Sequence, residues 1–217
     1  MIRGAAEGGA DERTAFAARY LPVVRSYIAA RWRSSPLAQD VDDAVHEVFV
    51  ECFREGGALA RVAPERPGGF RAFLYGVARN VALRFESRQA RHREQQPSPS
   101  FSPDQLANGD DALSQVFDRA WARAIMREAA VRQAQWASTA GDDAVRRVEL
   151  LRLRFYEDLP IREIAERWQA DPAQVHRWYA RAREEFKQAL LEVIAFHHPD
   201  APGVAESECA RLLSMLA

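Results

Sequence analysis

Apolar residues recur along most of this chain at the three- and four-residue spacing of an α-helix, and this periodicity most strongly limits its fold. No segment shows the alternation of apolar and polar residues that a half-buried strand requires. The two clearest apolar stripes are Phe16, Tyr20, Val23, Val24, Tyr27 and Ile28, and then Val41, Val45, Val48, Phe49, Cys52 and Phe53. Pro22 leaves open whether the first stripe is one helix or two. The sequence therefore predicts an all-α fold.

A stretch rich in Pro and Ser divides the chain near its middle. Residues 95–103 read QQPSPSFSP, and Asn-Gly-Asp-Asp follows at 108–111. This composition buries too little apolar surface to order itself, which indicates a flexible linker between two small helical domains. The expected segments are an N-terminal extension (1–13), a first helical domain (14–95), the linker (96–112), a second helical domain (113–196) and a C-terminal tail (197–217).

The second domain contains the spacing of a helix-turn-helix. Two helices are expected at about 160–168 and 172–193, separated by three residues. Asp171 can cap the second helix, Pro172 suits its first position, and Gln174 completes a capping box. The core-facing residues would be Val175, Tyr179, Ala182 and Phe186. The outward residues, which suit either a solvated face or phosphate contacts, would be His176, Arg177, Trp178, Arg181, Arg183 and Lys187.

Charge is balanced over the whole chain but segregated along it. The 217 residues contain 30 basic and 31 acidic side chains, so bulk attraction to a polyanion is excluded. Residues 37–55 carry a local net charge of −5, and residues 70–94 one of +4. Asp40, Asp43 and Glu47 share one helix face, and Arg84, Arg88 and Arg91 share another. Either patch alone could be a solvated face.

Cysteine and histidine give no sign of a metal or cofactor. Cys52 and Cys209 have neither the CxxC spacing of a zinc site nor partners for a disulfide framework. His197 and His198 lack a third ligand at useful spacing. No apolar run is long enough to span a bilayer, so no direct membrane insertion is expected. We predict no catalytic residue, no metal, no cofactor and a cytoplasmic location.

Three motifs together resemble the extracytoplasmic-function (ECF) sigma factors of bacterial RNA polymerase. Residues 40–49, DVDDAVHEVF, resemble the family's "DAEDLVQEVF" helix, and residues 71–80, RAFLYGVARN, resemble its "RAWLYRIARN" helix. Residues 156–166, YEDLPIREIAE, with Val175 and 181–183 (RAR), resemble its helix-turn-helix. The motifs occur in the family's order between about residues 14 and 190.

The resemblance implies a promoter-specificity subunit that acts without catalysis of its own. It implies core RNA polymerase as partner, through the β′ clamp and the β flap, together with promoter DNA and an anti-sigma protein or other regulator. The implied polymerase-docking residues are Asp40, Asp42, Asp43 and Glu47. The implied −10 contacts are Arg79, Asn80, Arg84 and Arg88. The implied −35 contacts are His176, Arg177 and Trp178 near the bases, with Arg181, Arg183 and Lys187 near phosphates.

Two other functions are compatible with parts of this pattern. A conventional helix-turn-helix regulator would bind duplex DNA tightly without polymerase. A helical hydrolase would use Asp40, Asp43 and His46, but the chain has neither a nucleophile motif nor a phosphate-binding loop. The sigma factor is the leading hypothesis.

Overall fold

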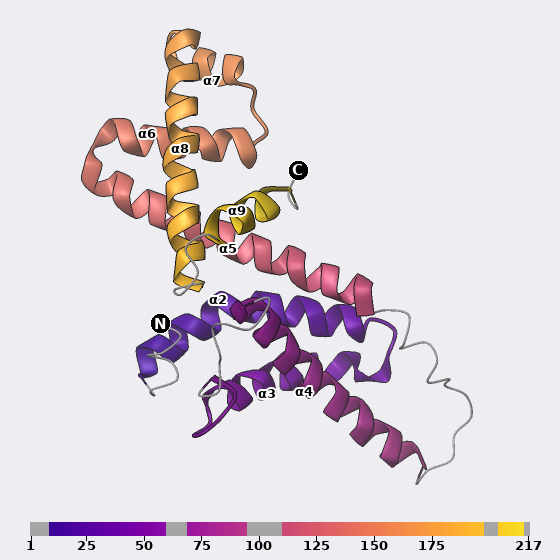
Figure 1. The fold of residues 1–217 in the computed structure, drawn as a ribbon. Helices are drawn as coiled ribbons and strands as arrows, with labels where there is room; N and C mark the ends of the chain where they lie inside the picture. Colours follow the sequence, from indigo (N-terminus) through magenta and orange to yellow (C-terminus); the bar gives the residue numbers. More distant parts are fainter. Residues whose placement is uncertain (1–8, 60–68, 95–109, 198–203, 215–217) are drawn as a thin grey trace. The chain divides into compact units, whose positions relative to one another are not determined.

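A computed structural model describes residues 9–59, 69–94, 110–197 and 204–214 (Figure 1). The elements in these ranges are all helices, and no β-strand occurs among them, which confirms the predicted all-α class. The chain divides into two compact units, with the boundary between Ala124 and Ile125. Residues 95–109 lie outside the described ranges, so the linker and the domain limits expected from the sequence stay predictions.

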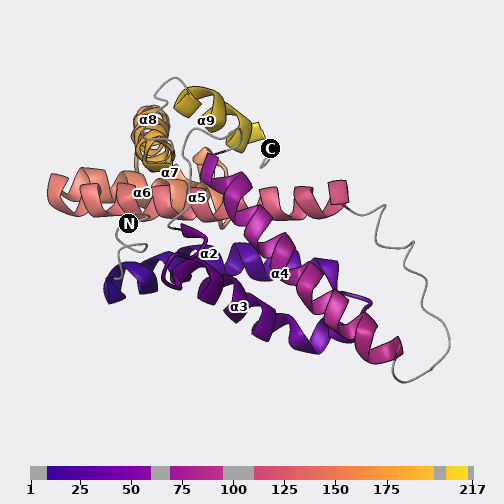
Figure 2. The same cartoon turned by 60° about the horizontal axis from the view of Figure 1, so that its bottom comes forward.

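Three long helices and one short one make up most of the first unit. They are α2 (Ala10–Arg31), the 3-10 helix η1 (Pro36–Asp40), α3 (Val41–Phe53) and α4 (Gly69–Glu94). Each of α2, α3 and α4 packs against the other two (Figure 2). The helix α2 continues through Pro22 as a single element, and its six stripe residues are completely buried. The first apolar stripe therefore belongs to one helix.

Aromatic rings fill the core of the first unit. Phe16 contacts Tyr20 edge to face, with ring centroids 4.7 Å apart. Tyr20 in turn stacks on Trp121, at 5.4 Å and an interplanar angle of 12°. Trp121 lies on α5 (Asp110–Ala140), and the part of α5 up to Ala124 belongs to this unit. Burial of such rings is a large source of stability in a small domain.

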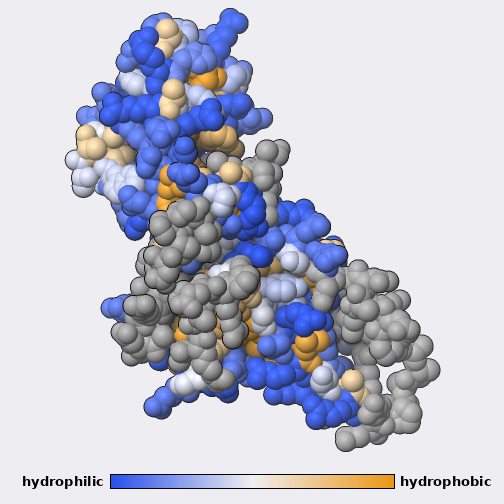
Figure 3. Space-filling model, viewed as in Figure 1, coloured by the Kyte–Doolittle hydropathy of each residue, from blue (hydrophilic) through white to orange (hydrophobic). Residues whose placement is uncertain are grey.

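The second unit consists of the rest of α5 with α6 (Asp142–Phe155), α7 (Ile161–Trp168), α8 (Pro172–His197) and α9 (Val204–Ser214). The helix α8 packs against α6, α7 and α9. One apolar cluster joins α6, α7 and α8 and contains Leu150, Leu153, Ile164, Ala165 and Val175. On the face drawn in Figure 3, hydrophilic residues cover most of this unit.

The C-terminal tail contributes a helix to the second unit. Cys209 and Leu212 of α9 are buried, at 3% and 0% exposure, and α9 packs on α8. The buried amide of Gln133 on α5 also reaches α8, where it donates a 3.0 Å hydrogen bond to the Ala182 carbonyl. Thus α8 is held from several directions.

Candidate functional site

The pair α7–α8 is joined by a three-residue turn, Gln169 to Asp171, at the spacing predicted from the sequence. Gln169 adopts a left-handed conformation (φ 49°) and closes α7 by donating its N–H to the Glu166 carbonyl. Asp171 Oδ1 accepts a hydrogen bond from the Ala173 N–H at 3.2 Å, so the predicted cap is present. The Gln174 amide oxygen accepts from Arg177 Nη2 at 2.7 Å instead of completing a capping box.

Five of the six outward residues predicted on α8 are exposed: His176, Arg177, Arg181, Arg183 and Lys187. Neighbouring groups hold all three of their guanidinium groups in place, that of Arg177 through its hydrogen bond to Gln174. Arg181 Nε donates to Glu185 Oε1 at 3.2 Å, and Arg183 lies over the Tyr179 ring at 5.7 Å. Of the four predicted core-facing residues, Val175 and Ala182 are fully buried, whereas Tyr179 and Phe186 are half-buried. One side of α8 is therefore a mainly cationic surface, which also includes the exposed Glu184.

The outward placement of Trp178 is wrong. Its side chain is half-buried and packs against the apolar cluster of α6, α7 and α8. Its ring contacts Trp168 edge to face at 6.3 Å, and the Arg146 guanidinium lies 5.5 Å from its centroid. The indole is too large and apolar to leave this cluster in favour of water. The sequence prediction followed a single row of apolar residues at helical spacing from Val175. The apolar face of α8 is wider than one row, so this prediction missed the position of Trp178.

A buried ion pair, which the sequence analysis did not find, joins α6 to α8. Arg147 is 7% exposed and donates to both carboxylate oxygens of Glu185, with distances of 2.7–3.0 Å. Glu185 thus accepts hydrogen bonds from Arg147 on one side and from Arg181 on the other. One feature of the sequence could have indicated this ion pair. Arg147 lies three residues from both Ala144 and Leu150, on the apolar face of α6, where a charged residue needs a partner.

The acidic residues of the first unit point in two directions. Asp43, Glu47 and Glu51 follow one another at four-residue steps along α3, so they share a face. Asp43 is exposed, and among the described residues it forms no hydrogen bond or ion pair. Asp42 lies off this row and pairs with Arg25 of α2. Asp40 ends η1 and is half-buried. The four predicted docking acids therefore do not form one uniform patch.

Asn80, Arg84 and Arg88 form an exposed row along α4, again at four-residue steps. Arg79 is half-buried and lies beside this row rather than in it. The Arg84 guanidinium lies 3.3 Å from Glu51 and 3.9 Å from Glu47, so it pairs with the acidic face of α3. The two oppositely charged segments found in the sequence therefore meet at Arg84.

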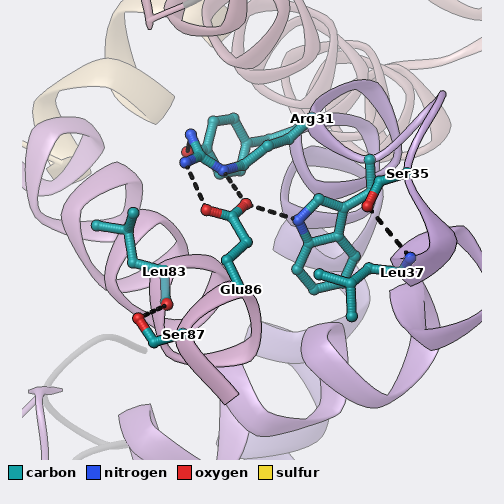
Figure 4. A network of polar contacts seen from close by, with 8 residues as sticks. Arg31, Ser35, Leu37, Leu83, Glu86 and Ser87 are labelled. Carbon is teal, nitrogen blue, oxygen red and sulfur yellow. Dashed lines mark hydrogen bonds and ion pairs between the residues drawn. The ribbon is translucent and has the colours of Figure 1, made fainter. Parts of the chain in front are cut away.

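A polar network fixes the end of α2 against α4 (Figure 4). Glu86 accepts hydrogen bonds from Arg31 Nε at 2.7 Å, from Arg31 Nη2 at 3.0 Å and from Trp32 Nε1 at 2.8 Å. These hydrogen bonds from Arg31 to Glu86 raise the pKa of the guanidinium further above its ordinary value. Glu86 lies two residues from both Arg84 and Arg88, so the network also holds the part of α4 that carries the exposed row.

Within the described ranges, no group of three or more His, Cys, Asp or Glu side chains could hold a metal ion. Both cysteines are buried free thiols, and burial raises the pKa of Cys52 to about 12. None of the helices described is both long enough and apolar enough to cross a membrane.

Comparison with protein families gives one match. Residues 16–92 match the model of Sigma-70 region 2, and this stretch contains all of α3 and most of α2 and α4. The match supports a sigma factor of the sigma-70 family, with a role in promoter recognition by RNA polymerase. Members of that family are transcription initiation factors and not enzymes. No curated protein and no solved structure matches the chain.

Proposed function

We propose that this chain is a sigma factor of the extracytoplasmic-function type, which binds core RNA polymerase and directs it to promoters with −10 and −35 elements. The observation that carries the proposal is the match of residues 16–92 to Sigma-70 region 2. The match coincides with the part of the chain in which an acidic face of α3 adjoins the exposed row of α4. A short helix pair with a cationic surface, α7–α8, follows it along the chain.

The acidic side chains of α3 and η1 dock on the β′ clamp of the polymerase. Asp43 contributes most, since it is exposed and its carboxylate has no ion pair within the described structure. Asp42 and Glu47 contribute less because Arg25 and Arg84 already lie beside them. Asp40, at the start of α3, completes the surface. Attraction between these carboxylates and a basic partner speeds association and weakens with salt.

The exposed row of α4 contacts the −10 element. Asn80 can donate and accept hydrogen bonds to a base, while Arg84 and Arg88 neutralise phosphates. Arg79, which is half-buried, supports this surface from the side. Unpairing and extruding a base costs a few kcal/mol, which stacking and pocket contacts of about 1–3 kcal/mol per base offset together with phosphate neutralisation.

The helix pair α7–α8 acts as a helix-turn-helix at the −35 element. His176 and Arg177 lie in the first two turns of α8, from which a recognition helix reaches base edges in the major groove. Arg181, Arg183 and Lys187 lie further along and are placed for phosphates. The β flap is the second polymerase surface that the family resemblance implies. Nucleotide transfer belongs to the polymerase, so this chain needs no catalytic group.

The test compares DNA binding and transcription with and without core polymerase. Full-length chain is mixed with core enzyme, and run-off transcription is measured from a library of random promoters. A sigma factor produces transcripts that share a two-part promoter, and the chain alone binds duplex DNA weakly. Tight duplex binding without core enzyme, with no binding to the core, would instead identify a conventional helix-turn-helix regulator.

A further inference from the structure

We infer that Trp178 is a positioning residue that fixes the rotation of α8 about its own axis and does not read a base. The inference rests on the proposed function of α8 as recognition helix and assigns a specificity-determining role to a three-residue cluster. The cluster consists of Arg146 on α6, Trp168 at the end of α7 and Trp178 on α8.

In this cluster one cation lies against two aromatic rings that also contact each other. The guanidinium carbon of Arg146 lies 5.7 Å from the Trp168 centroid and 5.5 Å from the Trp178 centroid. Both distances fall within the roughly 6 Å at which a cation is attracted to a ring face. The two indoles also contact each other, at 6.3 Å and an interplanar angle of 63°. One arginine of α6 thus contacts both α7 and α8, the helix pair that carries the cationic surface.

The next residue of α6 makes a second attachment to α8. Arg147 binds Glu185, and Glu185 lies seven residues after Trp178. Seven residues are about two helical turns, so Trp178 and Glu185 lie on the same side of α8 at two heights. Two contacts at different heights on one side prevent α8 from turning about its axis. A third restraint is the buried hydrogen bond from Gln133 to the Ala182 carbonyl.

The rotation of α8 decides which side chains face a groove of DNA. His176 precedes Trp178 by two residues and so lies roughly 200° around the axis from it. With the Trp178 side held against α6 and α7, His176 faces away from the unit, in agreement with its exposure. A rotation of α8 by one residue would turn a different set of side chains toward the bases. Base readout then belongs to His176 and Arg177.

Two substitutions of Trp178 separate positioning from base readout. Trp178→Phe removes the indole N–H, the one hydrogen-bond donor that could read a base, and keeps an aromatic face for Arg146. Trp178→Ala removes both. Loss of a base reader relaxes specificity at one base pair. Loss of a positioning residue instead weakens specificity at every base pair that α8 reads, because all its side chains shift together. Trp136→Phe and Trp136→Ala are matched controls, because Trp136 is an exposed tryptophan of the same unit.

The experiment selects transcribed sequences from a duplex promoter library, using full-length chain in complex with core polymerase. We expect Trp178→Phe to keep the wild-type base preferences and yield. We expect Trp178→Ala to lower the yield about tenfold and to weaken the preference at every base pair that α8 reads, with no single position affected alone. Arg146→Gln gives a smaller, equally uniform loss. A changed preference at one base pair in Trp178→Phe, or a yield in Trp178→Ala equal to that of Trp136→Ala, would overturn the inference. Failure of the wild-type complex to select any promoter would count against the proposed function instead.

A measurement without polymerase tests the cluster directly. Arg146→Gln is expected to change the near-ultraviolet circular dichroism of the full-length chain, since Trp168 and Trp178 lose the cation that contacts both rings. Arg162→Gln, at an exposed arginine of α7 that pairs with Glu166, is the control and leaves the signal unchanged. Identical spectra for Arg146→Gln and wild type would overturn the positioning role, whatever the outcome with polymerase.

Discussion

The substitution Glu86→Ala removes a carboxylate that accepts three hydrogen bonds. The carboxylate accepts two bonds from Arg31 and one from Trp32, and the side chains of Arg31 and Glu86 are only 4% and 14% exposed. After the substitution the largely buried guanidinium loses the carboxylate that accepts two of its hydrogen bonds. Removal of one partner from a buried ion pair costs about 3–5 kcal/mol. The cost is near the lower limit of that range, about 3 kcal/mol, because water reaches part of Glu86.

Urea unfolding of the full-length chain, followed by far-ultraviolet circular dichroism, measures this loss. Glu55→Ala is the matched control, since Glu55 is an exposed acid of the same unit, and a change within about 0.5 kcal/mol is expected there. The double variant Arg31→Met with Glu86→Gln removes the buried charge and retains an amide oxygen for Trp32, so it should recover much of the stability. A loss below about 1 kcal/mol for Glu86→Ala would refute the reasoning.

Three further predictions concern the first unit. Asp43→Asn is expected to weaken binding to core polymerase several-fold at low salt, measured by fluorescence anisotropy, with Glu55→Gln unchanged. Glu51→Gln weakens the ion pair between Glu51 and Arg84 and is expected to raise the affinity of the chain for single-stranded DNA. The increase should exceed that of Glu55→Gln, which removes the same charge at another position. A Cys52 pKa of about 12 in the folded chain, against 9.0 ordinarily, means that the native state retains its proton longer. Stability is then complete below pH 9 and falls as the pH rises toward 12, and Cys52→Ala removes this slope in urea titrations.

Periodicity alone predicted the helices and much of the core, because a helical stripe is a local property of the sequence. The buried residues of α2 are the six that the first stripe contains, and the turn between α7 and α8 lies where its capping residues indicated. Whether Pro22 broke α2 was beyond local reasoning, since the answer depends on the tertiary contacts of both halves.

Contacts between helices were the part that the sequence could not supply. Arg31 and Glu86 are 55 residues apart, and Arg147 and Glu185 are 38 apart. Nothing in a helical stripe states which turn of one helix lies opposite which turn of another. Missing knowledge of contacts between helices also explains why Trp178 was predicted to face outward. Its position depends on Arg146 of another helix and on the width of the core. The charged faces were predicted, but their meeting at Arg84 was not.

The short helix α7 depends on its neighbours for its stability. It has eight residues, whereas an isolated helix of fewer than about 12–15 residues is marginal in water. Residues in the left-handed conformation lie near both of its ends, Asp158 before it (φ 51°) and Gln169 after it (φ 49°). This conformation is unfavourable for Gln169, whereas Asp adopts it more readily. Its order comes from Ile164 and Ala165, which are buried against Val175 of α8. The amide protons of α7 are therefore protected from solvent exchange only as long as α8 stays packed, so the two helices open and close as one unit.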